Sequence, residues 1–136
     1  MATSEQRNHA KAYLAKAEEY LASAQDNLAA KRNTPAAGDA IHAGISAKDS
    51  IVTALTGTTS KGKDHATGAK ELKLALGQRT EAANSERAFR ELVAAKGDVE
   101  YGVNVITRAK AEPLVRVERA ASLNSPSRSC GSGADI

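Results

Sequence analysis

The segment from Ala36 to Gly57, AAGDAIHAGISAKDSIVTALTG, constrains the fold of this chain more than any other. Its apolar and small side chains recur every three or four residues, the period of an α-helix with one buried face. They are Ala37, Ile41, Gly44, Ile45, Ile51, Val52 and Leu55. Pro35 suits a first helical turn, where its missing N–H is not needed, and Gly57 suits a left-handed C-cap. We therefore predict the central helix of a bundle.

Polar side chains follow one edge of this predicted helix. They are spaced three or four residues apart and so face the same way. They are Asp39, His42, Ser46, Asp49 and Thr53. We expect this edge to line a groove, with His42 and Asp49 on one wall and Asp39 close enough to orient the imidazole. The alternative is a partly buried histidine with a satisfied ring beside a solvated face.

The remaining pattern is helical as well. Trp is absent and aromatic residues make up only 3% of the chain, which favours helices packed through small side chains over strands. We predict an all-α domain over residues 1–123, an up-and-down bundle of four main helices plus a short fifth one, followed by a disordered Ser/Gly-rich tail at 124–136. Ser4 is the expected N-cap of the first helix.

The predicted helices can be bounded from their caps and their periodicity. The expected elements are a helix at 5–31, the central helix to Gly57, a short helix capped by Asp64 and ending at Gly77, and a long helix that begins near Arg79 or at Ser85 and runs to Lys110. The first helix carries a heptad-like seam of Leu14, Leu21 and Leu28, with Ala10, Ala17 and Ala24 between them. Pro113 either kinks the long helix or starts a fifth one. Small-residue seams on the first, second and long helices exceed what one bundle buries, which predicts a two-fold dimer. Gly97 and Gly102 on the long helix suggest that a backbone or ligand comes close there.

Lys96 breaks the apolar seam of the long helix, between Leu92 and Val99. Burying an unpaired ammonium is costly. The lysine must therefore snorkel to solvent, meet a carboxylate such as Asp49 or Glu100, or face a groove. If Lys96 faces a groove, Lys96 and the nearby Tyr101 are candidate ligand-binding residues, together with His42 and Asp49. His65 would then lie at the rim of this groove.

The charge balance permits nucleic-acid binding without demanding it. Net charge is +3, but basic and acidic residues are interleaved along the chain. The candidate contacts to nucleic acid are Lys61, Lys63, Arg87 and Arg90. A solvated surface is the alternative reading of these four residues.

The sequence lacks the motifs that are typical of several functional classes. There is one Cys, and no HExxH, no Walker A loop and no GxGxxG, so we expect no metal and no cofactor. The chain also has no long apolar run and no signal-peptide pattern, and we expect a cytoplasmic protein without membrane contact.

Two blocks, DAIHAGISAKDSIVTALTG and LVAAKGDVEYG, joined through a loop with KGKDH, resemble the HEPN superfamily (higher eukaryotes and prokaryotes nucleotide-binding) in a compact bacterial form. The resemblance implies a helical bundle, a homodimer and a toxin–antitoxin or defence setting. Many HEPN proteins are metal-independent ribonucleases with an Arg-x4–6-His motif on the later helices. No Arg here is followed by His at that spacing, which puts the nuclease activity in doubt.

The sequence therefore predicts a non-catalytic HEPN-like module that binds a nucleotide, nucleic acid or a partner protein. One rival is a divergent ribonuclease that uses His42 or His65 with Lys96. The other is a purely structural or antitoxin-like interaction protein whose polar flank is simply solvated.

Overall fold

A computed structural model describes residues 3–57, 65–79 and 82–123 of the chain, and these residues form five α-helices and no strand. The helices are α1 (Ser4–Ala29), α2 (Asn33–Thr56), α3 (His65–Leu76), α4 (Ala82–Tyr101) and α5 (Arg108–Leu123). The all-α prediction is confirmed. Lys61, Lys63, the Asp64 cap and the 124–136 tail lie outside the described residues, as does the side chain of His65.

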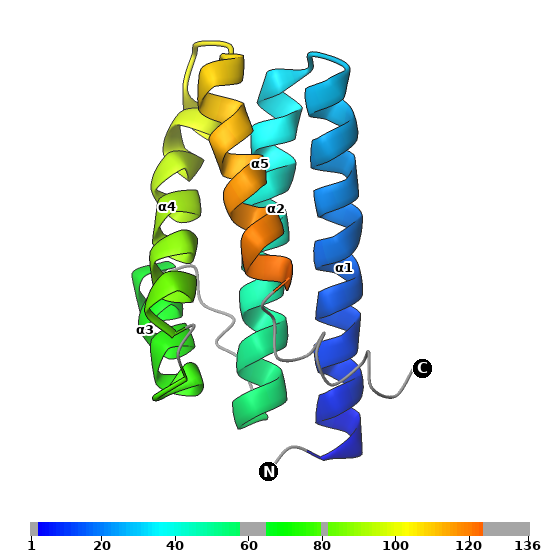
Figure 1. The fold of residues 1–136 in the computed structure, drawn as a ribbon, viewed down its shortest axis with the longest axis vertical. Coiled ribbons are helices and arrows are strands. Elements are labelled where there is room, and N and C mark those ends of the chain that lie inside the picture. Colours follow the sequence, from blue (N-terminus) through cyan, green and yellow to red (C-terminus); the bar gives the residue numbers. More distant parts are fainter. Residues whose placement is uncertain (1–2, 58–64, 80–81, 124–136) are drawn as a thin grey trace.

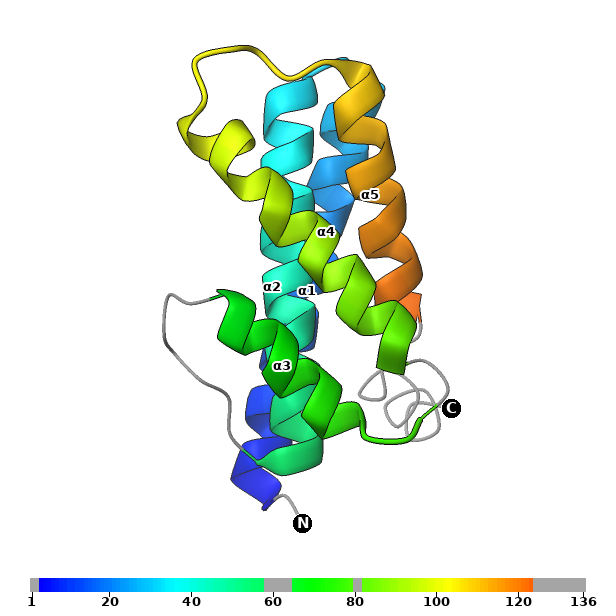
Figure 2. The ribbon, with the colours of Figure 1, turned by 90° about the vertical axis from the view of Figure 1, so that its left-hand side faces the viewer.

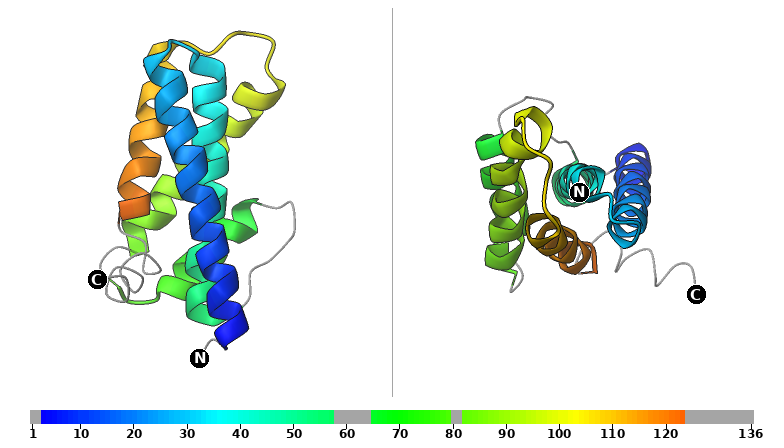
Figure 3. Two further views of the ribbon diagram at one scale, coloured as in Figure 1. Left: turned by 90° about the vertical axis from the view of Figure 1, so that its right-hand side faces the viewer. Right: turned by 90° about the horizontal axis from the view of Figure 1, so that it is seen from above.

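The long helices run side by side and alternate in direction, while α3 is a short helix packed low on the bundle (Figure 1). Seen from above, α2 lies between α1 and α4, with α5 closing one side (Figure 3). The α4 helix is inclined to α1, α2 and α5 (Figure 2). The α2 helix packs against all four other helices, as expected of a central helix.

Small side chains let α1 and α2 approach closely. The α1 residues Ala10, Ala17 and Ala24 are buried, and so are five alanines of α2. A buried hydrogen bond joins the two helices, in which the Ser50 hydroxyl donates to the carbonyl oxygen of Ala10 at 2.7 Å. Because one chain already buries these seams, the argument that they exceed what a single bundle can cover is wrong for α1 and α2.

The core consists of two clusters along α2. One joins α2 to α4 and α5 through Ala36, Ala37, Ala40, Ile41, Leu92, Val99, Ile106, Ala111, Leu114 and Val115, with Ala24 from α1. The other joins the far half of α2 to α3 and the start of α4 through Ile51, Val52, Ala69, Leu72, Leu76 and Phe89. The α3 helix therefore turns Ala69, Leu72 and Leu76 toward the core.

The helix ends follow local capping chemistry. The N-cap of α1 is Thr3 and not Ser4: the Gln6 backbone N–H donates to the Thr3 hydroxyl, and the Thr3 N–H donates to the Gln6 side chain. Gly57 is the left-handed C-cap of α2, with φ of 91°, as predicted.

The predicted long helix to Lys110 is wrong, because α4 ends at Tyr101 and α5 begins at Arg108. A Cβ on Gly102 would lie 2.5 Å from the carbonyl oxygen of Asp98. The backbone at the end of α4 therefore requires glycine at this position. The Ile106 backbone N–H donates to the Thr34 hydroxyl at 3.0 Å, which holds the loop against α2.

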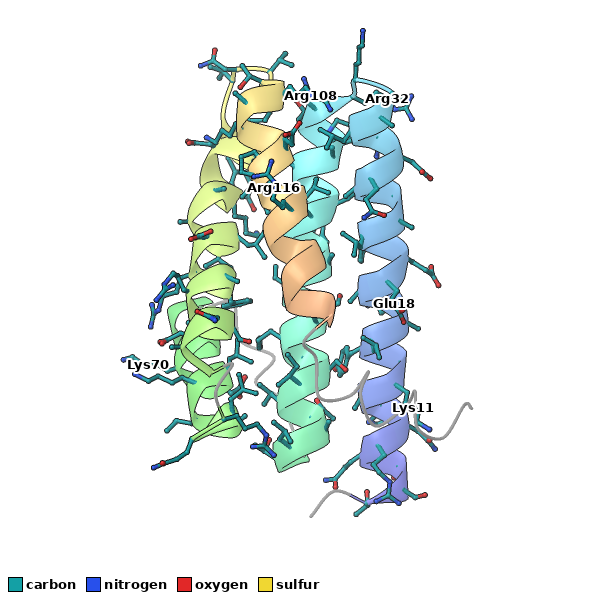
Figure 4. The ribbon with its side chains drawn as sticks, viewed as in Figure 1. Lys11, Glu18, Arg32, Lys70, Arg108 and Arg116 are labelled. Carbon is teal, nitrogen blue, oxygen red and sulfur yellow. The ribbon has the colours of Figure 1, made fainter. Side chains whose placement is uncertain are left out.

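The start of α5 is fixed by two contacts. Thr107 accepts a hydrogen bond from the Lys110 N–H at 3.3 Å, as an N-cap does. Arg108, which lies at the upper end of the bundle (Figure 4), donates to the Leu28 carbonyl oxygen near the end of α1. Pro113 lies inside α5, which begins five residues earlier at Arg108, so the predicted start of the last helix at Pro113 is wrong.

Two glycine substitutions should have opposite effects on stability. Gly57→Ala should lower the free energy of unfolding by about 1–2 kcal/mol, because alanine disfavours a left-handed backbone. In addition, its Cβ would lie 2.8 Å from the Gln6 side-chain nitrogen. Gly97→Ala should raise the free energy of unfolding by about 0.5–1 kcal/mol, since the new Cβ inside α4 would meet nothing within 4 Å beyond its chain neighbours and its own helix backbone. Urea unfolding of both variants tests this, and a loss of stability in Gly97→Ala would contradict it.

Candidate functional site

Side chains from three helices meet on one face of the bundle. Tyr20 comes from α1, His42 from α2, and Lys96, Glu100 and Tyr101 from the last turns of α4. We call these five residues the His42 cluster. Lys96 and Glu100 are four residues apart, so the helix itself places them on one face.

The Glu100 carboxylate links α4 to α2. One of its oxygens lies 3.5 Å from His42 Nε2, and the other lies 3.0 Å from Lys96 Nζ. The Glu100 side chain is about one-fifth exposed, while the His42 side chain is roughly half exposed. The carboxylate can therefore orient the imidazole while one edge of the ring faces solvent.

Aromatic rings flank this pair of contacts. The Tyr20 ring is tilted by 31° against the His42 ring, with 5.2 Å between their centres. The Lys96 ammonium lies 5.6 Å from the centre of the Tyr101 ring, within the range of a cation–π contact. The Tyr101 ring itself is largely exposed and so offers a free face to a ligand.

The charge of Lys96 is held in place by its partner. The hydrogen bond to Glu100 raises the pKa of Lys96 above its ordinary value, and burial of the lysine opposes that rise. Lys96 is therefore an ammonium at neutral pH, and it is paired with a carboxylate, one of the outcomes that its position in the sequence allowed.

The candidate residues named from the sequence divide into groups. His42, Lys96 and Tyr101 come together in the His42 cluster. Asp49 lies away from it, with an oxygen 2.7 Å from Lys48 Nζ. Asp39 does not orient His42, because its carboxylate accepts hydrogen bonds from Ser23 and Asn27 of α1.

Two of the candidate basic residues are described, both on α4. Arg87 is exposed, and Arg90 donates two hydrogen bonds to Glu86, four residues earlier. Lys73 of α3 reaches the same carboxylate at 4.0 Å. Acidic side chains therefore offset part of the positive charge on this face, as the interleaved sequence pattern suggested.

Sequence reasoning assigned no role to Lys48, the most deeply buried lysine among the described residues. Its side chain is 7% exposed, compared with 23% for Lys96. Its Nζ lies 2.7 Å from a carboxylate oxygen of Asp49, on the same helix, and 3.3 Å from one of Glu71, on α3. In the sequence, Lys48 interrupts the apolar and small residues between Ala47 and Ile51, as Lys96 interrupts the seam of the later helix.

Lys48 helps to hold α3 against α2. Gly68 of α3 lies over the lysine stem, where an added Cβ would approach its Cε and the Phe89 ring at 3.4 Å. A cavity of about 20 Å³ beside them is lined by Lys48, Ser85 and Phe89 among others, with room for about one water molecule. This cavity is too small for a ligand, so we assign the surrounding residues to structure.

Within 3–57, 65–79 and 82–123, no group of three or more His, Cys, Asp or Glu residues could hold a metal ion. Over the same ranges, none of the helices is sufficiently long and apolar to cross a membrane. No protein-family model matches this chain, and comparisons with curated proteins and with solved structures give no match either. The HEPN resemblance thus rests on the sequence pattern.

Loss of the buried ammonium should weaken the fold. Lys48→Met keeps most of the packing of the stem but leaves Asp49 and Glu71 without this partner, each about one-fifth exposed. We expect the free energy of unfolding to fall by about 1–3 kcal/mol. The control Lys73→Met removes an exposed lysine and should change it by less than about 0.5 kcal/mol. Equal effects of the two variants in urea unfolding would contradict this account, and so would a more stable Lys48→Met.

Proposed function

We propose that this chain is a non-catalytic, HEPN-like binding module, and that the His42 cluster is its site for a nucleotide or single-stranded nucleic acid. The observation that carries the proposal is that one carboxylate, Glu100, contacts both His42 and Lys96. The His42 ring packs against Tyr20, and the Lys96 ammonium lies over the Tyr101 ring. The aromatic residues are far apart in the sequence, so the fold alone brings them together.

The chemistry of the cluster fits a base with an attached phosphate. An exposed tyrosine ring stacks on any nucleobase, and such stacking is worth about 1–3 kcal/mol per base. The Lys96 ammonium beside the Tyr101 ring can meet a phosphate oxygen. Glu100 neutralises part of that charge, so we expect modest affinity and a shallow salt dependence.

The HEPN resemblance supports the same proposal and extends it. It suggests a toxin–antitoxin or defence setting and a homodimer, and from the sequence we expect the protein in the cytoplasm. A partner protein is the alternative occupant of the His42 cluster. If no ligand binds there, we would conclude that the chain is a purely structural or antitoxin-like interaction protein.

A divergent ribonuclease is the second candidate, because one observation favours it. His42 and Lys96 contact the same carboxylate, so a histidine oriented by Glu100 lies near an ammonium. Such a pair has the parts for general acid–base catalysis and for stabilising a charged phosphate in the transition state. The missing Arg-x4–6-His motif argues against this candidate, and a cleavage assay decides between the two.

Binding should depend on the charge of Lys96. Lys96→Met keeps most of the packing of the stem and removes the charge. We expect it to weaken binding of a fluorescein-labelled single-stranded RNA by about 1–3 kcal/mol while the melting temperature rises slightly or stays unchanged. The control is Lys70→Met on α3, whose side chain points away from the bundle (Figure 4) and whose loss should leave the affinity unchanged.

Two results of this experiment would contradict the proposal. An equal loss of affinity in both variants would indicate diffuse electrostatic attraction. Unchanged affinity in Lys96→Met would remove the His42 cluster as the site.

Glu100→Gln separates the two candidate functions. If the cluster only binds an anionic ligand, loss of the carboxylate should strengthen RNA binding, since it releases Lys96 and removes a negative charge. If His42 catalyses cleavage, the same change should lower the cleavage rate because the imidazole loses its orienting partner. Cleavage of the labelled RNA in EDTA, compared with His42→Ala, measures this. Cleavage by the wild type that disappears in His42→Ala would overturn the non-catalytic proposal.

A further inference from the structure

The large hydrophobic side chains that the described residues expose are concentrated where α4 gives way to α5. Val103 and Val105 are 98 and 83% exposed, and they follow Tyr101 of the His42 cluster, which is 76% exposed. We call the two valines the loop patch. Their segment projects beyond the helices at the upper end of the bundle (Figure 2). Leu74 on α3 is also exposed, but it stands alone at the lower end.

The exposure of the loop patch has a local cause. The backbone N–H of Ile106 bonds to Thr34, and the Ile106 side chain enters the core, which fixes the end of the loop against α2. The short path from Gly102 to Thr107 then leaves both valines outside. Exposed apolar side chains that cluster in this way mark an interaction surface.

A hollow of about 250 Å³ lies beside the valines. It is lined by Asp98, Gly102, Val103, Asn104, Val105, Ile106, Thr107 and Lys110. Asp98 and Lys110 form an ion pair across it, with 2.7 Å between Asp98 Oδ2 and Lys110 Nζ. The Lys110 ammonium holds the pKa of Asp98 below its ordinary value, so this carboxyl is charged at neutral pH.

We infer that the loop patch docks a second copy of this chain across a two-fold axis. A two-fold contact requires a surface that is complementary to itself, so that each feature has its counterpart in the same patch. Here a protruding valine adjoins a hollow, and a carboxylate adjoins an ammonium. The valine of one copy can enter the hollow of the other, and Asp98 of one copy can face Lys110 of the other.

The balance of charge also favours this occupant. The hollow carries one carboxylate and one ammonium, so it offers no net field to nucleic acid or to a strongly charged partner. Stable interfaces bury about 800 Å² per partner, so the loop patch would form the apolar centre, with Asp98 and the first turn of α5 in the rim. This inference rests on the homodimer of the proposed function and names its surface.

The experiment is sedimentation equilibrium of the full chain over a wide range of concentration. We expect the wild type to give twice the monomer mass. Val103→Asp and Val105→Asp should each raise the dissociation constant of the dimer by roughly tenfold or more, because a carboxylate would enter an apolar centre. The matched control is Leu74→Asp, the same change at the exposed hydrophobic residue on α3, and it should leave the dissociation constant unchanged. All three sites are exposed, so circular dichroism should find every variant folded.

Each other outcome overturns the inference. A wild type that is monomeric throughout excludes the second copy, and a dimer that Leu74→Asp disrupts while the valine variants persist places the interface on α3. The RNA titration of Lys96→Met distinguishes this failure from failure of the proposed function. RNA binding that depends on Lys96 in a monomeric protein would remove the docking inference alone, and a dimer that binds no RNA would remove the nucleic-acid site alone.

Discussion

The structure depends on one constraint, the burial of most of the α2 surface by the four other helices. A helix can be enclosed so closely only if its side chains are small, and α2 meets its neighbours with alanine, glycine and serine over most of its length. Each buried polar group on such a helix needs a partner. Ser50 finds one in a carbonyl of α1, and Lys48 finds its partners in Asp49 and in Glu71 of α3. These contacts fix the positions of α1 and α3 around the centre.

The same arrangement produces the His42 cluster. His42 lies at the edge of α2, where the closely packed α1 and α4 helices both reach it. Tyr20 and Glu100 therefore both contact the imidazole, although Tyr20 lies far before His42 in the chain and Glu100 far after it. A site of this kind has a rigid scaffold, because every one of its residues lies on a helix and not on a loop.

Much of the fold could be predicted from sequence because its signals are local. The period of α2, the glycine at its end and the heptad-like seam of α1 all depend on neighbours within a few turns. The α4–α5 boundary could not be predicted, since Val103 and Ile106 continue the helical period and the contact that holds the loop, from Thr34, comes from 72 residues away. Lys48 and Lys96 posed a similar problem. Both interrupt apolar faces, and only the position of α3 decides which of them is buried.

The site was predictable in part for the same reason. His42, Lys96 and Tyr101 each stood out against a local pattern, and the three lie together. Tyr20 gave no such signal, because a tyrosine beside a heptad seam is ordinary rim packing. The groove residue Asp49 shares its helical edge with His42, but it lies two turns away and beside Lys48, whose burial draws the carboxylate into the α2–α3 contact.

The most direct test of the account is a chemical-shift map of the backbone amides by NMR during titration with a short single-stranded RNA. If the His42 cluster is the binding site, the perturbed amides will gather at Tyr20, His42 and residues 96–101, on three different helices, and saturate together. Perturbations that gather instead around Arg87 and Arg90, or an unchanged spectrum at a large excess of RNA, would contradict the central claim.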